Sequence, residues 1–306
     1  MPETILITGA NGQIGTELTL ELLQRGHRVI ATDVSSPRTK ITDFEVLDVQ
    51  DDLRLKSILL RNDVTQIYHL AAILSARGEQ HPSLAWSINV NGSLKILEAA
   101  HDLHVARVFM PSSIAVFGST TPKVNTPQQT VTEPNTMYGV TKVAGELLGS
   151  YFAQKKGLDV RSVRYPGLIS YKTKPGGGTT DYAVEIFAAA KQHGRYTCFL
   201  RPDTRLPMMY MPDALRATLQ LMETPHANLS LTTAYNIAAF SFTPAELAAA
   251  IQVYLPHFSM SYAPDFREQI ARSWSESIDD AMARADWGWQ PQYTLDAMVQ
   301  DMLANS

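Results

Sequence analysis

Residues 4–15, with the sequence TILITGANGQIG, determine the fold of the N-terminal half. The first five residues are mostly apolar and β-branched, which is typical of a buried strand. Glycines then recur at a spacing of three, at Gly9, Gly12 and Gly15, and a helical pattern begins within this loop. In such a strand–loop–helix unit, the first glycine permits a tight turn, the second lets a phosphate approach the backbone, and the third lets the helix pack on the strand. Ordinary turns and helix caps also use glycine, so the triplet alone is weak evidence for a cofactor site.

Short strand patterns alternate with longer helical patterns through the rest of the first half. Strands are expected at residues 4–8, 28–32, 44–47, 66–70, 107–111 and 160–164. Helices are expected at residues 13–25, 52–61, 83–103 and 136–155. Gly26 and Gly157 lie where helix C-termini favour glycine. This order predicts βαβ units and an α/β fold with a doubly wound, Rossmann-type parallel sheet.

The second half of the chain has a different pattern. Residues 172–180 are rich in proline and glycine, and helices dominate afterwards, at residues 181–193, 212–223 and 244–254. We therefore expect a dinucleotide-binding domain over residues 1–170 and a smaller, mostly helical substrate lobe over residues 171–306. Segments near 208–221 are expected to return to the first domain.

The composition favours small-molecule chemistry. The 306 residues are 45% hydrophobic and 18% charged, which is enough to bury a sizeable core. The 26 Lys and Arg residues nearly balance the 30 Asp and Glu residues, so no basic field is available for nucleic acid or an anionic membrane. No stretch approaches the roughly 18 apolar residues of a membrane span, and the first apolar run is too short for a signal peptide.

The cysteine and histidine content argues against a metal site. Cys198 is the only cysteine, which excludes an intramolecular disulfide and a multi-cysteine zinc site and fits a reducing compartment. His69, His81 and the other histidines show no metal-ligand spacing, so no metal is expected. We expect a cytoplasmic protein, or one of an organelle matrix if a transit peptide has been removed.

A carboxylate at the end of the second expected strand supports the interpretation of the glycine loop as a dinucleotide site. Asp33 follows Gly15 by 18 residues. A carboxylate there can accept hydrogen bonds from both hydroxyls of an adenosine ribose and would repel a 2′-phosphate, so NAD is favoured over NADP. Arg38 is the nearby charge that would weaken this discrimination. Alternatively, Asp33 opens the turn formed by residues 34–37.

The ends of the next strands extend the expected cofactor site. Asp48 and Val49 follow the third strand, where they would meet the adenine, although Asp48 could instead cap the next helix. Residues 70–72 close the fourth strand with a leucine and two alanines, where a cofactor would lie against the backbone. The expected NAD-binding residues are Gly9, Gly12, Gln13, Ile14, Gly15, Asp33, Val34, Asp48, Val49, Leu70, Ala71, Ala72, Tyr138, Lys142 and Leu168.

Tyr138 and Lys142 form the expected proton-transfer pair. They lie four residues apart at the start of a predicted helix, so their side chains share one face. A phenol has a pKa of about 10, and lowering it by about three units requires roughly 4 kcal/mol of stabilisation of the phenolate. The Lys142 ammonium and the positive nicotinamide ring of oxidised NAD could supply this. A pair with this spacing also arises by chance.

Two serines at the end of the fifth strand support the pair. Ser112 and Ser113 stand in the segment PSSIAVFG, residues 111–118, and Ser113 precedes Tyr138 by 25 residues. A hydroxyl there can bind the reacting oxygen of a substrate. The alternative is that both serines cap or turn the chain as it leaves the strand.

The glycine loop, Asp33, the segment 113–118 and the Tyr138–Lys142 pair together resemble the extended short-chain dehydrogenase/reductase superfamily. Segments in the second half narrow this to a resemblance to the epimerase-like L-threonine 3-dehydrogenases. They are RYPGLIS at 164–170, PGGGTTDY at 175–182, LPMMY at 206–210, YNI at 235–237, SFTP at 241–244 and DWGW at 286–289. Two departures are Ser113 and Ala115, where that family usually has threonine and glycine. Phe117 replaces the tyrosine common in sugar-nucleotide epimerases, which favours the dehydrogenase branch.

The resemblance implies NAD-dependent oxidation of the 3-hydroxyl of L-threonine to 2-amino-3-ketobutyrate. Tyr138 would take the hydroxyl proton, Lys142 would hold the phenolate and the nicotinamide ribose, and Ser113 would bind the same hydroxyl. The product would lose carbon dioxide to give aminoacetone, or would be cleaved by a CoA ligase acting as a metabolic partner. The implied substrate-binding residues are Ser75, Ser112, Ser113, Tyr138, Thr179, Thr180 and Trp274.

Some of these assignments have structural alternatives. Residues 176–178 could form only a flexible connector, and Trp274 could belong to the core. The resemblance also implies a homodimer through the helices at 83–103 and 136–155, whose apolar faces could equally pack internally.

Two other functions share part of this pattern. A sugar-nucleotide epimerase or dehydratase would have the same cofactor loop and tyrosine, but it needs basic and aromatic residues for a nucleotide, and residues 172–182 offer few. A regulatory NAD-sensing protein would use the fold without catalysis, and it has no need for the set Ser113, Tyr138 and Lys142.

Overall fold

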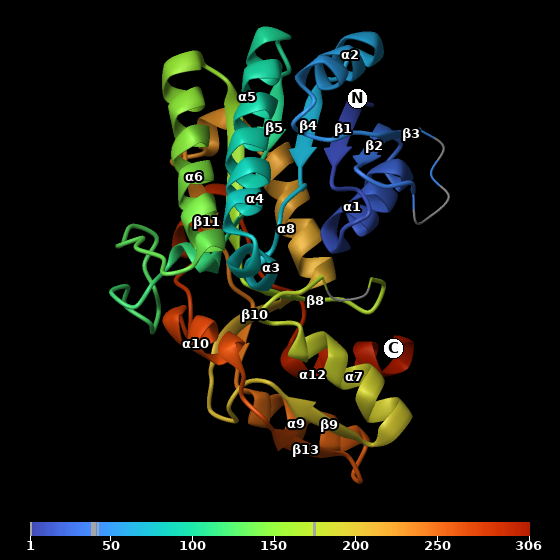
Figure 1. The fold of residues 1–306 in the computed structure, drawn as a ribbon, viewed down its shortest axis with the longest axis vertical. Coiled ribbons are helices and arrows are strands. Elements are labelled where there is room, and N and C mark those ends of the chain that lie inside the picture. Colours follow the sequence, from blue (N-terminus) through green and yellow to red (C-terminus); the bar gives the residue numbers. More distant parts are fainter. Residues whose placement is uncertain (1, 38–40, 42, 174–175) are drawn as a thin grey trace.

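The computed structural model describes residues 2–37, 41, 43–173 and 176–306 of the chain. Its larger part is built on a parallel sheet with the strand order β11-β7-β5-β4-β1-β2-β3, and β6 also pairs with β7 (Figure 1). These strands are β1 Thr4–Thr8, β2 Arg28–Asp33, β3 Phe44–Val46, β4 Gln66–His69, β5 Arg107–Phe109, β6 Ser112–Ser113, β7 Asp159–Tyr165 and β11 Ala234–Asn236.

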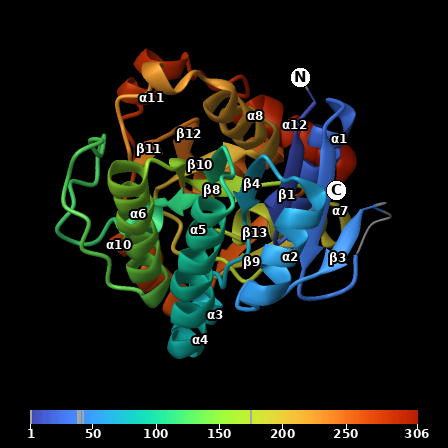
Figure 2. The same cartoon turned by 90° about the horizontal axis from the view of Figure 1, so that it is seen from above.

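Helices cover both faces of this sheet. On one face lie α2 (Asp52–Asn62), α5 (Ser93–Asp102) and α6 (Met137–Lys156), and on the other lie α1 (Gln13–Gln24) and α8 (Met211–Glu223), as Figure 2 shows from above. Strand β1 contributes to the core on each face of the sheet: Leu6 packs under α2 and α5, and Ile5 and Ile7 pack under α1 and α8. Both faces of the sheet are therefore buried, and this explains why the strands of the first half are mostly apolar.

The helix expected at residues 83–103 is present over residues 82–102, but its middle part is wound more widely than an α-helix. After α3 (Ser75–Gln80), the chain forms α4 (Pro82–Trp86), a π-helical segment η1 (Ser87–Gly92) and then α5. The wider turn lets the buried Asn89 side chain bind the backbone of Ile73 at both its N–H (2.8 Å) and its carbonyl (3.0 Å). Apolar periodicity does not report such a local widening, which here depends on contacts with a distant loop.

Strands β4 and β5 also end earlier than expected. The sequence predicts strands to residues 70 and 111, but these end at His69 and Phe109. The last residues of each pattern are apolar because they line the carboxyl edge of the sheet. They are buried or half-buried, and the N–H groups of Leu70 and Met110 still donate to the Thr8 and Arg161 carbonyls of the neighbouring strands.

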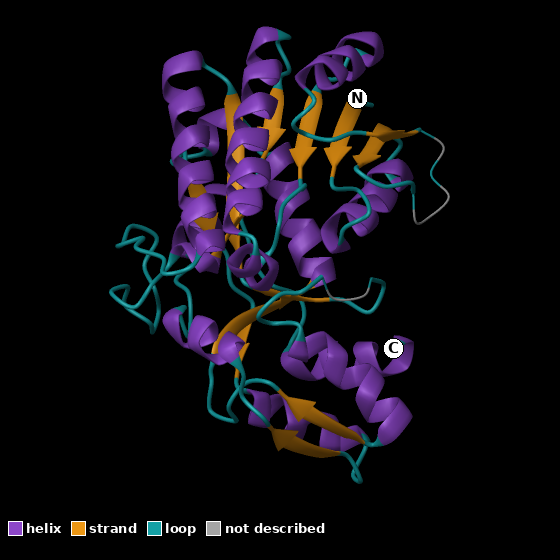
Figure 3. Ribbon diagram, in the orientation of Figure 1, coloured by secondary structure: helices purple, strands orange, loops and turns teal. Residues whose placement is uncertain are grey.

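A second lobe lies beyond the carboxyl edge of the sheet (Figure 3). Its helices are α7 (Tyr182–His193), α9 (Pro244–Tyr254), α10 (Phe266–Ser273) and α12 (Leu295–Asn305). Helix α11 (Ala281–Trp287) packs instead against β11 of the main sheet, and short 3-10 turns lie elsewhere in the chain at η2 (Ile114–Val116) and η3 (His226–Asn228). The second lobe also contains two small sheets, β12-β10-β8 and β13-β9, which the sequence did not predict because their strands are only three to five residues long. These strands are β8 Gly167–Ile169, β9 Arg195–Cys198, β10 Leu206–Tyr210, β12 Phe240–Phe242 and β13 Ser259–Tyr262.

The chain crosses between the two lobes more than once. After β10, helix α8 packs against α1 and β7, and strand β11 then joins the main sheet beside β7. The predicted class, a doubly wound α/β sheet with a smaller C-terminal lobe, is confirmed. Among the described residues, no helix is both long enough and apolar enough to cross a bilayer.

Candidate active site

A pocket of about 230 Å³ opens at the carboxyl edge of the sheet, between the sheet and the second lobe. Parallel strands all end at this edge, and ligands of doubly wound proteins bind there. The pocket brings together predicted residues from both halves of the chain: Gly9, Gly12, Gln13, Ile14, Gly15, Leu70, Ala72, Ser75, Ser112, Ser113, Tyr138, Lys142, Leu168, Thr179, Thr180 and Trp274.

The glycine loop forms one wall and has the shape that a pyrophosphate requires. Gly9 has a φ of +70°, and a Cβ there would lie 2.6 Å from the Ala71 nitrogen. A Cβ on Gly15 would collide with the Gly9 carbonyl oxygen, so only glycine allows this approach of helix to strand. Helix α1 begins after Gly12 with no side chain capping it, so its N-terminal N–H groups and positive dipole end face the pocket.

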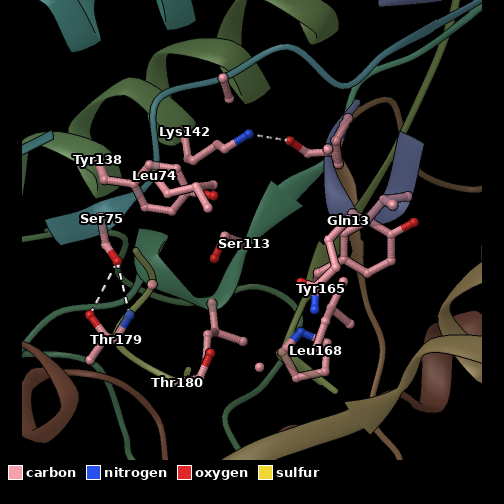
Figure 4. A pocket seen from close by; sticks show the side chains of 18 of the residues that line it. Gln13, Leu74, Ser75, Ser113, Tyr138, Lys142, Tyr165, Leu168, Thr179 and Thr180 are labelled. Carbon is pink, nitrogen blue, oxygen red and sulfur yellow. Dashed lines mark hydrogen bonds between the residues drawn. The ribbon is translucent and has the colours of Figure 1, made fainter. Parts of the chain in front are cut away.

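Gln13 gives an independent indication of a polar ligand. Its Nε2 is buried and has no hydrogen-bond partner among the described protein atoms, although the side chain lines the pocket (Figure 4). A buried amide donor without an acceptor is costly, and a phosphate oxygen would satisfy it. These residues therefore fit the pyrophosphate of a dinucleotide.

The residues expected around the adenosine lie outside this pocket. Asp33 Oδ2 accepts from the Asn11 N–H at 3.1 Å and Oδ1 accepts from the Ser35 N–H at 3.4 Å, so the carboxylate steadies the glycine loop and also opens the following turn. Val34 is 68% exposed, and Ala71 contributes only its backbone behind Gly9. Arg38 lies outside the described residues.

Asp48 and Val49, which follow β3 and Leu47, differ in their surroundings. Val49 is buried and lies against Gly92, whereas Asp48 is exposed and accepts from the Gln50 N–H at 2.9 Å. The alternative that Asp48 caps the next helix is wrong, because Asp51 accepts from the Arg54 N–H there. Asp51 stands one residue before the first turn, as a cap must.

Helix α6 carries Tyr138 and Lys142 in its first two turns. Thr136 caps the helix by accepting from the Gly139 N–H at 3.1 Å. The Lys142 Nζ donates to the Pro111 carbonyl at 2.8 Å and lies 5.5 Å from the centre of the Tyr138 ring. Ser113, at the end of β6, faces the same space (Figure 4). The structure thus brings the three predicted catalytic residues into one pocket.

Both serines also make the structural contacts that the sequence left open. Ser113 Oγ accepts from the Ala115 N–H at 3.2 Å and caps the 3-10 turn. The Ser112 hydroxyl donates to Glu146 at 2.5 Å. Ser113 therefore combines a cap with a place in the pocket, and the Ser112 hydroxyl is engaged with a buried carboxylate.

Burial sets the protonation of Tyr138 and Lys142. It raises the pKa of Tyr138 to about 12, and a hydrogen bond with Ser113 opposes the rise. It lowers the pKa of Lys142 to about 8, and the charge of Glu146 opposes the fall. The pocket by itself thus holds a neutral phenol, so an added positive charge, such as that of an oxidised nicotinamide, is needed to favour the phenolate.

The opposite wall comes from three separate segments. Ser75 Oγ lies 3.1 Å from Thr179 Oγ1 and accepts from the Thr179 N–H at 3.3 Å, and both side chains are buried (Figure 4). Trp274 is 5% exposed, and its Nε1 is buried without a partner among the described protein atoms. Trp274 therefore belongs to the core and also lines the pocket.

Several lining residues were missed by the sequence analysis. They are Leu74, Pro111, Ile114, Tyr165, Pro166, Gly167, Gly178 and Asp181. Asp181 Oδ2 accepts from the N–H groups of Gly177 and Gly178 at 2.8 and 2.7 Å, which shapes the turn that carries Thr179. Its position directly after Thr179 and Thr180 was the available signal. Among the described residues, no three His, Cys, Asp or Glu side chains converge on a metal position.

The comparisons place the chain in a family. The model of the NAD dependent epimerase/dehydratase family matches residues 5–238. An uncharacterized epimerase/dehydratase of Staphylococcus aureus is 47% identical over 98% of this chain and 95% of its own length. The chain therefore belongs to the NAD-dependent epimerase/dehydratase family, as its motifs predicted.

Two solved structures are more similar still. The GalE-like L-threonine dehydrogenase from Cupriavidus necator, in its holo form, is 54% identical over 99% of each chain, with a TM-score of 0.97. The L-threonine dehydrogenase from Phytophthora infestans is 51% identical over 98% of each chain, with a TM-score of 0.96. The likeness extends over both lobes, including the segments that form the second wall of the pocket.

Proposed function

We propose that this chain is an NAD-dependent L-threonine 3-dehydrogenase, which oxidises the 3-hydroxyl of L-threonine to 2-amino-3-ketobutyrate. The observation that carries this proposal is the 54% identity, over 99% of both chains, to a solved L-threonine dehydrogenase. The pocket supports it, because a proton-transfer pair faces a wall of hydroxyl and indole groups across a space suited to a small polar molecule.

The three residues at the centre of the pocket share the proton chemistry. Ser113 and Tyr138 bind the substrate hydroxyl, and its proton passes to the Tyr138 oxygen as the C–O bond becomes a carbonyl. Lys142 stabilises the phenolate by charge. NAD supplies the acceptor for the hydride that leaves Cβ of the substrate. Because burial raises the pKa of Tyr138 to about 12, the phenolate needs the positive charges of Lys142 and of oxidised NAD beside it.

The second wall provides groups for a zwitterionic amino acid. The unpartnered Nε1 of Trp274 is a donor for the carboxylate. Ser75, Thr179 and Thr180 supply hydroxyls that can donate or accept, and Ser112 supports the site through Glu146. We assign these residues to the substrate and the glycine-loop residues, with Leu70, Ala72 and Leu168, to NAD.

The adenosine end of the cofactor is assigned to Asp33, Val34, Asp48, Val49 and Ala71. Asp33 stands at the end of β2 beside the glycine loop, to which Asn11 joins it. A carboxylate at this position disfavours a 2′-phosphate, so we expect a preference for NAD over NADP.

The function is tested by mixing the purified protein with NAD and L-threonine and following NADH absorbance. L-threonine should give NADH, whereas UDP-galactose, which a sugar-nucleotide epimerase would convert, should not be consumed. NADP in place of NAD should give a much lower rate. Conversion of UDP-galactose without NADH from L-threonine would overturn the proposal in favour of an epimerase, and NAD binding without either reaction would favour a sensor.

We also infer a homodimer through α4 and α6. Three apolar side chains on the outer face of α6 are exposed: Val140 by 39%, Leu147 by 65% and Tyr151 by 52%. On α4, Trp86 is 42% exposed. Sedimentation of the protein and of Leu147→Asp should give a dimer and a monomer, respectively. A wild-type monomer would refute this inference.

The product identifies a metabolic neighbour. A 2-amino-3-keto acid loses carbon dioxide readily unless another reaction consumes it first. We therefore expect a CoA ligase that acts on 2-amino-3-ketobutyrate as a metabolic partner. The buried, unpaired thiol of Cys198 fits a reducing compartment such as the cytoplasm.

A further inference from the structure

A buried ion pair lies directly behind the catalytic lysine. Arg164 of β7 donates to Glu146 of α6 through two parallel hydrogen bonds, Nε to Oε1 at 2.9 Å and Nη2 to Oε2 at 2.8 Å. The two side chains are 6% and 8% exposed. Ser112 donates a third hydrogen bond to Glu146 Oε1 at 2.5 Å. Burying such a pair costs desolvation free energy, so we expect it to do more than join a helix to a strand.

The position of the pair relative to Lys142 suggests that role. Glu146 follows Lys142 by one helical turn, and both line a cavity of about 20 Å³, close to the size that one water molecule needs. Arg164 does not line this cavity, because Nη1 points away, to the Gln128 carbonyl at 3.0 Å and Asn236 Oδ1 at 3.1 Å. Of the two members of the pair, Glu146 is therefore the one that shares this cavity with Lys142.

The other titratable groups around Lys142 do not supply this charge. The two cavities that Lys142 lines also contain His69 of β4, Tyr138 of α6, Tyr165 of β7 and Asp181 at the start of α7. Burial raises the pKa of both tyrosines, so their phenols are neutral. Burial lowers the pKa of His69 to about 3, so this imidazole is neutral. The Asp181 carboxylate accepts from the N–H groups of Gly177 and Gly178 and does not line the smaller cavity behind Lys142. Glu146 is the carboxylate left to oppose the burial of Lys142.

We propose that Glu146 is a positioning residue for the reaction: held by Arg164 and Ser112, its carboxylate keeps the buried Lys142 ammonium charged so that Lys142 can support the Tyr138 phenolate. The proposal rests on the proposed dehydrogenase function only for its catalytic consequence. The electrostatic relation between Glu146 and Lys142 is a property of the chain itself. Ser112, which adjoins Ser113, keeps the carboxylate oriented toward the site.

The direct test is the titration of Lys142 by NMR in protein labelled with ¹³C at lysine Cε, with Lys142→Met to assign the signal. In Glu146→Gln, the pH at which Lys142 titrates should fall by about one unit, the size of shift that a neighbouring charge produces. In Glu146→Asp, which keeps the charge, it should stay near the wild-type value. An unchanged midpoint in Glu146→Gln would overturn the proposal.

A second ion pair on the same strand, with a buried arginine and a half-buried carboxylate, serves as a control. Arg161 binds Asp159 at 2.9 and 2.8 Å, at the opposite end of β7 from the pocket. Asp159→Asn should lower stability without moving the titration of Lys142. If it moves the midpoint as much as Glu146→Gln does, the effect is general and the proposal fails.

The catalytic consequence is measured separately. In the NADH assay, Glu146→Gln should move the alkaline limb of the pH profile of kcat/KM to lower pH by the same amount, because Lys142 loses its proton earlier. A wild-type protein inactive on L-threonine would refute the proposed function but leave the NMR test valid. A shifted NMR midpoint with an unshifted limb would refute the link to catalysis.

If the Glu146→Gln variant does not fold, a double variant provides the same test. Glu146→Gln with Arg164→Met removes both buried charges, and such neutral replacements often keep stability. Because Glu146 is the member that faces Lys142, the midpoint should still fall, by less than in the single variant. A midpoint equal to that of the wild type would overturn the proposal.

Discussion

The two walls of the pocket are built in different ways. The centre of the wall that we assign to NAD, here called the cofactor wall, is one continuous segment, in which Gly9, Gly12 and Gly15 shape the backbone and the start of α1 supplies the N–H groups. The opposite wall, here called the substrate wall, consists of Ser75 after β4, Thr179 before α7 and Trp274 after α10, each about 100 residues from the next along the chain.

This difference separates two kinds of recognition. The cofactor wall depends on the absence of side chains at fixed positions, so most changes there should act on NAD. The substrate wall depends on hydrogen bonds between distant side chains, so changes there should act on L-threonine and leave NAD binding intact. Tyr138 and Lys142 stand between the walls and should affect the chemical step.

The largest effect is expected for Tyr138→Phe. Without the phenol, no group takes the substrate proton, so kcat should fall by about 10³, within the range for general acid–base catalysis. The dissociation constant for NAD, measured by calorimetry, should change less than about twofold. Tyr151→Phe, at an exposed position of the same helix, is the control and should keep full activity. Undiminished NADH formation by Tyr138→Phe would exclude it as the base.

Gly15→Ala tests the cofactor wall. The new Cβ would collide with the Gly9 carbonyl oxygen, so the loop must shift, and NAD should bind about 100-fold more weakly, at a cost of roughly 2.7 kcal/mol. Gly26→Ala is the matched control, because Gly26 has a φ of +83° but open space around its Cβ position. That change should cost about 1 kcal/mol of stability and leave NAD affinity unaltered. Wild-type NAD affinity in Gly15→Ala would contradict this account of the loop.

Ser75→Ala tests the substrate wall. It removes a buried hydrogen bond to Thr179, worth about 1 kcal/mol, so KM for L-threonine should rise roughly fivefold without a change in NAD affinity. Ser261→Ala, which removes the exposed bond to Thr197 at 2.9 Å, should change neither constant. An equal loss of NAD affinity in Ser75→Ala would mean that the two walls are not separable.

The smallest effect is expected for the dependence of folding stability on acidic pH. His69 joins β1 to α5 through Thr8 Oγ1 (2.8 Å) and Ser93 Oγ (3.1 Å), and burial lowers its pKa from 6.5 to about 3. Between these values the unfolded chain binds a proton that the folded chain does not, so stability falls as the pH falls. From pH 6 to 5 the loss should be about 1 kcal/mol.

Urea unfolding at both pH values measures this loss. His69→Gln should remove about 1 kcal/mol of the pH dependence, whereas His81→Gln, at an exposed position, should not. If wild type and His69→Gln lose equal stability, the buried imidazole is not the acid-sensitive group.

The sequence determined what depends on local spacing. The glycine triplet, the strand–helix alternation and the four-residue interval between Tyr138 and Lys142 are all set by neighbours in the chain, because turn geometry and helical period are local. They were sufficient to predict the doubly wound sheet, and the family likeness of the second half added the substrate.

Only the tertiary structure decided how the distant parts meet. No spacing rule places Trp274 or Thr179 opposite Tyr138, or Arg164 behind Glu146, because those contacts arise when β7 and the second lobe pack against α6 and the loop after β4. The protonation of the site belongs here as well. The phenol and the ammonium have ordinary pKa values in an isolated peptide, and it is burial in the folded protein that moves them to about 12 and 8.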